Sequence, residues 1–265
     1  MTTVAFRCLA DESHTAAECD LHTCRVNNIT IFFHQVTDLI TLHHLENSRS
    51  QRILWLLEEL DLKYKIKRYE RDKKSGLAPA ALKKVHPLGK SPVLRDGDLT
   101  LAESAVIVEY LARQYGDDQW APKPGDDDYW AFNFWLHYAE GSLMPPLLLR
   151  LVFERVRTGP MPFFVRPIAR GIADKVDQAF INDQIRTHFG YVDQHLSEHE
   201  WFAGNQISIA DIQMSFPLEA AVAGGTIGDS HPHIVAFVQR FQARPAYLRA
   251  LEAGGDYDYG PREEA

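Results

Sequence analysis

The sequence is poor in cysteine, and this low content bounds where the protein works. Its 265 residues include three cysteines, Cys8, Cys19 and Cys24. A small, odd number is typical of a reducing compartment and argues against a disulfide scaffold. Cys19 and Cys24, with His14 and His22 nearby, have the side chains of a metal site, but their spacing fits no usual zinc pattern. We therefore expect no bound metal ion.

Long apolar runs and an excess of positive charge are also missing. The most apolar stretch, "LMPPLLLRLVF", is broken by prolines and an arginine, whereas a membrane-spanning helix needs about 20 apolar residues. The net charge of -8 disfavours nucleic acid as a partner, because phosphate binding requires a basic surface. The first residues resemble neither a secretory signal nor a mitochondrial presequence. We expect a cytoplasmic protein without a transmembrane segment.

Residues 1–36 show no sustained hydrophobic period, and we expect them to form an extension outside the main fold. The stretch "NITIFFHQV" within them is apolar enough for a short strand or a buried arm. Regular patterns begin near Asp38, so residues 37–117 predict a first domain.

The first domain predicts a mixed sheet with helices packed against it. "DLITLHHL" alternates as a half-buried strand does, and residues 53–60 predict a helix covered on more than one side. "YKIKRYER" predicts a second strand, "APAALKKV" a short helix, and Asp96-Gly97 the turn of a hairpin. "SAVIVEYLARQYG" predicts a helix that ends at Gly116. The order β-α-β-α-β-β-α indicates a thioredoxin-like α/β arrangement.

The second half predicts an all-helical domain. Residues 118–125 are acidic and rich in Pro and Gly, as a linker is, and residues 126–255 have helical periods throughout. The first long helix should be kinked by Pro145-Pro146. Ser208 and Asp211 form a capping box in "NQISIADI", which starts a helix and performs no chemistry. Residues 256–265 predict a frayed tail.

A polar elbow separates the first strand of the main fold from its first helix. "HHLENSRSQRILWLLEEL" (residues 43–60) places Asn47, Ser48 and Arg49 there. The simple interpretation is a helix cap. The alternative is that the elbow binds an anion at the positive end of the helix.

Several motifs in order resemble the soluble glutathione transferases. "HPLGKSPVL" resembles the family's loop ending in a cis-proline, "LAES" its glutamate-serine motif, and "SIAD" its capping box. "ENSRSQRILWLLEELDL", "LKKVHPLGKSP" and "YAEGSLMPPLLLRLV" look like the fungal branch with a serine-type elbow. The resemblance covers roughly residues 38–250. It implies a thioredoxin-like domain, an all-helical domain and a homodimer, and for fungal relatives it leaves open a peripheral association with internal membranes.

The resemblance implies that the elbow ionises the thiol of glutathione. A free thiol has a pKa near about 8.5, and lowering it by about two units requires roughly 2.7 kcal/mol. A hydroxyl or amide donor supplies about 1.5–3 kcal/mol and a helix N-terminus about 0.3–1 kcal/mol. Ser48 is the favoured donor because it precedes Arg52 at the spacing of the serine-type classes. Asn47 competes with it, and Arg49 adds positive field or contacts the glycine carboxylate. No metal, cofactor or separate base is required.

The other motifs imply contacts to the rest of the tripeptide. Pro92 would be cis, and the backbone of Ser91 would pair with the cysteinyl unit. Lys90 would meet the glycine carboxylate or stay solvated. Glu103 and Ser104 open a helix whose N-terminus suits the γ-glutamyl carboxylate, unless they only cap it.

The pocket for an electrophile is expected between the domains. Its candidate residues are Tyr129, Trp135, Tyr138, Met144 and Glu140, the last of which would reach toward glutathione. For the aromatic residues, a place in the core or in a dimer interface is the alternative. The expected function is conjugation of glutathione to small apolar electrophiles, in detoxification or secondary metabolism. The alternatives are a glutathione-dependent peroxidase with the same site and a non-catalytic glutathione-binding scaffold.

Overall fold

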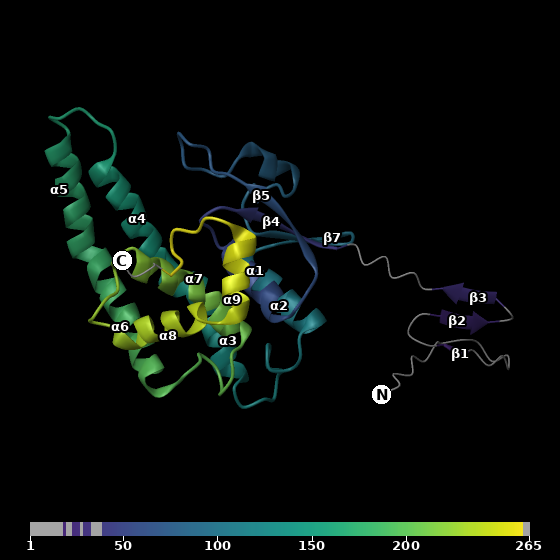
Figure 1. Ribbon diagram of the computed structural model, residues 1–265. Helices are drawn as coiled ribbons and strands as arrows, with labels where there is room; N and C mark the ends of the chain where they lie inside the picture. The colour runs from purple at the N-terminus through teal and green to yellow at the C-terminus, as the bar shows by residue number, and fades with distance from the viewer. Residues whose placement is uncertain (1–17, 20–22, 27–28, 33–38, 262–265) are drawn as a thin grey trace. The chain divides into compact units, whose positions relative to one another are not determined.

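The computed structural model describes residues 18–19, 23–26, 29–32 and 39–261 (Figure 1). The chain divides into two units, Met1–Asp38 and Leu39–Ala265. In the first unit, β1 (Glu18–Cys19), β2 (Thr23–Val26) and β3 (Ile29–Phe32) form an antiparallel sheet. The predicted apolar stretch therefore contains a strand. Of the Cys–His group considered above, His14 and His22 lie outside the described residues.

The main sheet of the second unit has the mixed topology that the sequence predicts. Its strands follow the spatial order β5-β4-β6-β7. β4 pairs parallel with β5, and the other two pairings are antiparallel. The strands are β4 (Ile40–Leu45), β5 (Tyr64–Tyr69), β6 (Val93–Asp96) and β7 (Leu99–Ala102). The short helix η1 (Ala80–Lys84) is a 3-10 turn, and α2 (Ser104–Tyr115) follows the hairpin.

The strand β4 is more buried than its alternating sequence predicts. His43 and His44 are each only 3% exposed. The Nδ1 atom of His43 shares a hydrogen bond with the Tyr69 hydroxyl, and Nδ1 of His44 shares one with the Ser50 hydroxyl. Burial lowers the pKa of both imidazoles, that of His44 to about 4. Both rings are therefore neutral at neutral pH, and β4 is a strand covered on both faces, not a half-buried one.

The helix α1 (Ser50–Glu59) lies between the sheet and two later helices, α7 (Ile209–Ala223) and α9 (Pro245–Gly254) (Figure 1). Residues 53–57 are fully buried. The ring of Trp55 stacks on Phe241 at 5.0 Å between centroids and meets Tyr247 edge-on. The continuous apolar run is thus explained by packing on both sides, as predicted, and α1 joins the two halves of the fold.

The second half is helical, with two π-helical turns. Its remaining elements are α3 (Tyr129–Tyr138), η2 (Ala139–Leu143), α4 (Met144–Thr158), α5 (Arg166–Val176), η3 (Asp177–Ile181), α6 (Asn182–Glu198) and α8 (Pro232–Gln242). The predicted long helix is interrupted by the π turn η2, and Pro145 and Pro146 lie in the first turn of α4, where proline is tolerated. The kink at these prolines stays a prediction. Among the described helices, none combines the length and apolar character needed to cross a bilayer.

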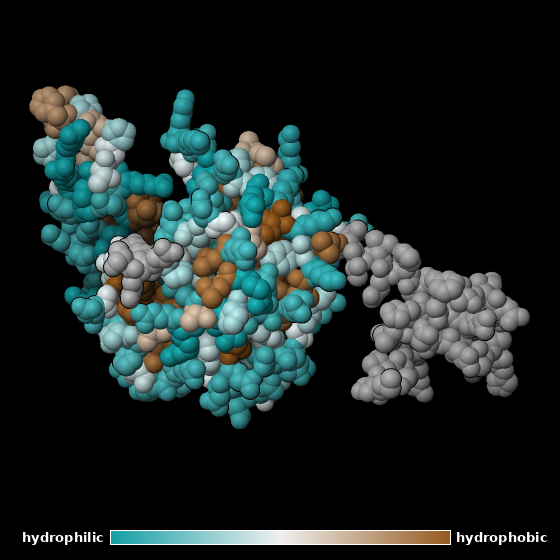
Figure 2. Space-filling model, in the orientation of Figure 1, coloured by the Kyte–Doolittle hydropathy of each residue, from teal (hydrophilic) through white to brown (hydrophobic). Residues whose placement is uncertain are grey.

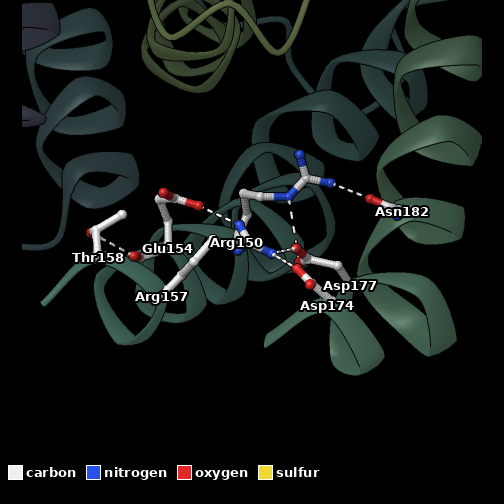
Figure 3. Close-up of polar contacts among 7 residues, drawn as sticks. All are labelled: Arg150, Glu154, Arg157, Thr158, Asp174, Asp177 and Asn182. Atoms are coloured by element: carbon white, nitrogen blue, oxygen red, sulfur yellow. Dashed lines mark hydrogen bonds and ion pairs between the residues drawn. The ribbon is translucent and has the colours of Figure 1, made fainter. Parts of the chain in front are cut away.

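The helices α4 and α5 form an arm that extends beyond the rest of the second unit (Figure 1). Arg157 contacts Asp174 at 2.9 Å and Asp177 at 2.5 Å, and Arg150 donates to Asn182 at 2.6 Å (Figure 3). Asp174 lies on α5, Asp177 on η3 and Asn182 at the start of α6, so these polar contacts hold α4 against all three elements. At the free end, Figure 2 shows apolar atoms, and there Phe163 is 80% exposed.

The capping box predicted in "NQISIADI" starts α7. Ser208 has an extended backbone, and its hydroxyl accepts a hydrogen bond from the amide of Ala210. The Asp211 carboxylate accepts from the amides of Ser208 and Phe202, each at 2.8 Å. Burial raises the pKa of Asp211 to about 6 in spite of these hydrogen bonds. The structural interpretation of this motif is confirmed.

The predicted frayed tail is wrong for residues 256–261. The Tyr257 hydroxyl donates to Glu219 at 2.9 Å, and the ring of Tyr259 meets Phe216 edge-on. Glu219 and Phe216 both lie on α7. Composition alone predicted disorder because the segment is acidic and glycine-rich. Its tyrosines nevertheless bury apolar surface and find a carboxylate partner, which offsets the cost of ordering it.

Candidate active site

The elbow between β4 and α1 buries the hydroxyl of Ser48. Ser48 is 6% exposed, and its Oγ donates to the carbonyl of Leu45 at 2.8 Å. The same oxygen lies 2.8 Å from the Ser50 hydroxyl and accepts from the Ser50 amide at 3.2 Å. Helix α1 begins at Ser50, and its N-cap residue Arg49 provides no side-chain cap. The hydroxyl expected to face a thiol is therefore occupied with shaping the elbow.

Asn47 lies at the outer side of the elbow in a left-handed backbone conformation, with φ of 47°. Its Nδ2 donates to the Asp258 carboxylate at 2.7 Å, and its Oδ1 accepts from the Asp258 amide at 2.8 Å. An amide Nδ2 carries two protons, and in the described part of the chain only one of them has an acceptor. Asn47 thus keeps a donor for a ligand.

The third elbow residue, Arg49, is paired with Glu140. The Arg49 Nε donates to Glu140 Oε1 at 2.8 Å, and Arg52 donates to the same oxygen at 2.5 Å. The guanidinium groups lie over the Phe216 ring, 5.1 and 5.8 Å from its centroid. The Arg52 side chain is 1% exposed and also donates to the Gln213 carbonyl. The cluster joins α1 to the π turn η2, and π turns are frequent at functional sites.

This cluster carries a net positive charge beside the elbow. Burial lowers the pKa of Arg52 to about 10 while Glu140 opposes the shift, so Arg52 stays a cation at neutral pH. Burial of Glu140 opposes its ionisation, but Arg52 and Arg49 outweigh burial and lower the pKa of this carboxyl. Two cations thus face one anion, and the excess favours a negatively charged ligand.

The loop before β6 reaches the elbow through Ser91. The Ser91 hydroxyl donates to the His43 carbonyl at 2.9 Å and accepts from the Leu45 amide at 3.2 Å. The Ser91–Pro92 peptide is cis, as the resemblance implies. Within the described residues, neither backbone group of Ser91 has a hydrogen-bond partner, so both are available to an extended ligand. Lys90 is exposed.

The hairpin places Glu103 and Ser104 beside this loop. Val93 of β6 pairs with Ala102 of β7. Glu103 and Ser104 follow Ala102 directly, so they lie next to the loop that leads into Val93. Glu103 has a φ of 71° and is exposed, whereas Ser104 is 5% exposed. A non-glycine residue in this conformation is uncommon and is often functional. The residues predicted for the tripeptide thus gather at one end of the sheet.

The predicted electrophile pocket is only partly assembled. Trp135 is 2% exposed and packs on Tyr191 and Phe202, and Tyr138 is 8% exposed, with its hydroxyl hydrogen-bonded to His188. These two are core residues, in line with the alternative considered for them.

Tyr129 also lies away from the elbow. It opens α3, eleven residues before Glu140, which corresponds to roughly 16 Å of helix. Met144 is half-buried one turn after Glu140. Of the five candidates, Glu140 contacts the elbow directly.

Comparison with known proteins agrees with this arrangement. Residues 37–113 match the model of the glutathione S-transferase N-terminal domain, and residues 161–245 match that of the C-terminal domain. The chain is 38% identical over 217 residues to glutathione S-transferase 3 of Schizosaccharomyces pombe, covering 81% of this chain and 87% of the relative.

The chain belongs to the glutathione S-transferase family.

Other glutathione transferases are similar to this chain in sequence and in fold. Glutathione S-transferase 1 of Saccharomyces cerevisiae is 37% identical over 222 residues, covering 81% of this chain and 94% of the relative. A glutathione S-transferase structure from Actinobacillus pleuropneumoniae superimposes with a TM-score of 0.67 at 34% identity, covering 81% of this chain and 92% of that one. The chain is therefore a glutathione transferase with the two-part fold of the family.

Two features of this transferase were not predicted from its sequence. Phe216, beneath the arginines, sits in a helix that is apolar almost throughout, so nothing marked it. Asp258, which holds Asn47, lies in the segment predicted to be frayed. The alternation of aspartate and tyrosine in "DYDY" was the available signal, because tyrosine is unusual in a solvated acidic tail.

Proposed function

We propose that this glutathione transferase conjugates the glutathione thiolate to small apolar electrophiles. Glutathione would lie along the backbone of Ser91, with its γ-glutamyl carboxylate at the start of α2 and its sulfur at the elbow. The reaction forms a carbon–sulfur bond and expels a leaving group such as chloride from the electrophile. The thiol proton has left the sulfur before this step, so the enzyme's task is to make the thiolate abundant and to position it.

We propose Asn47 as the side chain that donates to the sulfur. Of the two candidates weighed above, Ser48 has its hydroxyl proton directed at the Leu45 carbonyl, whereas Asn47 keeps a free amide proton. The start of α1, where the N-cap residue Arg49 provides no side-chain cap, and the excess positive charge of the Arg49–Glu140–Arg52 cluster support an anion at this place. Ser48 would then shape the elbow.

Substitution at the elbow tests this assignment. Asn47→Ala should lower kcat/KM with glutathione and a chloronitrobenzene by about 10- to 100-fold, the effect of losing one hydrogen bond to a charged group. The pKa of the bound thiol, followed by thiolate absorbance, should rise in parallel. Ser48→Ala is the matched neighbour and should change the thiol pKa little. A loss confined to Ser48→Ala would contradict Asn47 as donor.

The same preparation separates the remaining functions. Turnover with a hydroperoxide alone would favour a glutathione peroxidase, and tight glutathione binding without turnover of either substrate would favour a scaffold. Ure2p5 of Phanerochaete chrysosporium has been cocrystallised with 1-(S-glutathionyl)-2,4-dinitrobenzene. Its likeness to this chain, at 21% identity, supports a common fold, so the electrophile has to be found by assay.

We also propose that the protein is a homodimer. The arm formed by α4 and α5 exposes apolar residues, among them Leu148, Leu151, Ile168 and Ile172, each at least half exposed. Such a row is unusual on a monomer and is typical of an interface. Sedimentation equilibrium should give twice the chain mass, and a concentration-independent monomer would refute the proposal.

A further inference from the structure

The C-terminal segment makes a two-point contact with the proposed thiolate donor. The backbone amide of Asp258 donates to Asn47 Oδ1, and the Asp258 carboxylate accepts from Asn47 Nδ2. One residue therefore offers a donor and an acceptor, matched to the two ends of one amide. The two partners are 211 positions apart in the chain.

The residues on either side of Asp258 fix it in place. Tyr257 donates to the Glu219 carboxylate, which is 2% exposed and also accepts from Gln242. Tyr259 meets the ring of Phe216 edge-on at 5.9 Å. Asp258 thus stands between two anchored tyrosines, and Phe216 is the ring that faces Arg49.

We propose that Asp258 is a positioning residue for catalysis, which selects the orientation of the Asn47 side-chain amide. This inference rests on the proposed function, because it gives Asn47 the role of donor to the sulfur. The C-terminal segment, residues 257–259, is on this account part of the active site.

The chemistry of an amide explains why selection matters. The oxygen and nitrogen ends of an asparagine side chain have almost the same shape, so hydrogen-bond partners decide which end points where. A flipped Asn47 would turn its oxygen toward the Asp258 carboxylate and its nitrogen toward the Asp258 amide N–H. Both contacts would be repulsive. The contact therefore fixes the remaining N–H in one direction, and without it the oxygen would face the sulfur part of the time.

The negative charge of Asp258 acts in the opposite sense, because an anion near the sulfur disfavours the thiolate. Asp258 is exposed, so water and salt screen its field. The gain from orienting the Asn47 amide should therefore outweigh the repulsion between the Asp258 carboxylate and the thiolate. The variant Asp258→Asn separates the two effects, since it keeps a carbonyl acceptor and the backbone donor but removes the charge.

The experiment compares full-length variants by the pKa of bound glutathione and by the pH profile of kcat/KM. Asp258→Ala should raise the thiol pKa by about half a unit to one unit and lower kcat/KM near pH 6.5 about three- to tenfold. Asp258→Asn should stay within about twofold of the wild type. Asp256→Ala removes an equal charge from an exposed neighbour and should change nothing. Thermal midpoints check that all variants fold.

Other results would overturn the inference in distinguishable ways. A faster enzyme after Asp258→Ala would show that the segment blocks the site. An equal effect of Asp258→Ala in the wild type and in Asn47→Ala would show that Asp258 does not act through Asn47. If Asn47→Ala alone leaves the thiol pKa unchanged, the proposed donor itself is wrong, and the inference fails with it.

Discussion

Ser208 lies just before α7 and Ser48 just before α1, and the two serines have different hydrogen-bond partners. Ser208 precedes α7 directly, and its hydroxyl accepts from the first turn of that helix. Ser48 stands two residues before α1, and its hydroxyl proton returns to the carbonyl of Leu45. The start of α7 is thus closed by a full capping box. At the start of α1 the N-cap residue Arg49 provides no side-chain cap, and the Ser48 oxygen accepts from the amide of Ser50.

The difference shows what makes a helix start available to a ligand. At α7, the carboxylate of Asp211 neutralises the positive end of the helix and takes up two backbone amides. At α1 no acidic residue lies in the first turn, and Arg49 and Arg52 add positive charge. The start of α7 is complete without a ligand, and the start of α1 has the positive charge that the proposed anion site requires.

The largest expected effect concerns a second buried carboxylate on α7, Glu219. Unlike Asp211, it accepts only from side chains, and burial raises its pKa to about 7 from an ordinary value of 4.5. The folded state therefore binds this proton more tightly than the unfolded chain does. The resulting stabilisation is complete below pH 4.5 and is lost as the pH rises to 7, by about 3 kcal/mol.

Urea unfolding at a series of pH values checks this expectation. Glu219→Gln cannot ionise at this position and does not lose this stabilisation. Its free energy of unfolding should therefore rise relative to that of the wild type between pH 4.5 and 7. Asp211 remains in both proteins and cancels in the comparison. A constant difference across this range would show that Glu219 keeps an ordinary pKa.

A smaller effect should distinguish the two serines themselves. Ser208→Ala removes a helix cap and should lower the free energy of unfolding by about 1–2 kcal/mol. Ser48→Ala should cost less, about 0.5–1 kcal/mol, because the Leu45 carbonyl keeps the Ser50 hydroxyl as a donor. Denaturant midpoints for the two variants give the ranking directly. A larger loss for Ser48→Ala than for Ser208→Ala would mean that the elbow depends on its serine more than the capping box does.

Much of the fold could be predicted from local patterns. The hairpin around Asp96-Gly97, the apolar run of α1 and the capping box at Ser208 each carry a signal within about ten residues. The alternating pattern of β4 wrongly predicted a half-buried strand. His43 and His44 are polar but buried, because each is hydrogen-bonded to a partner elsewhere in the chain. Burial of a polar side chain cannot be inferred without knowing its partner.

The candidate site was predictable only in outline. Motifs located Ser91, Glu103 and the elbow, and the structure brings these segments to one end of the sheet. They could not rank Asn47 against Ser48, because that depends on which carbonyl or carboxylate each side chain meets. Trp135 and Tyr138 could not be separated from pocket residues by sequence, since a core and an apolar pocket use the same side chains.

The contact between Asn47 and Asp258 joins residues that are 211 positions apart, so the elbow is synthesised long before its partner. The last described helix, α9, ends at Gly254, ahead of Asp258. A product truncated between these two residues would keep the sheet and the described helices, and Asn47 would lack the contact that orients its amide.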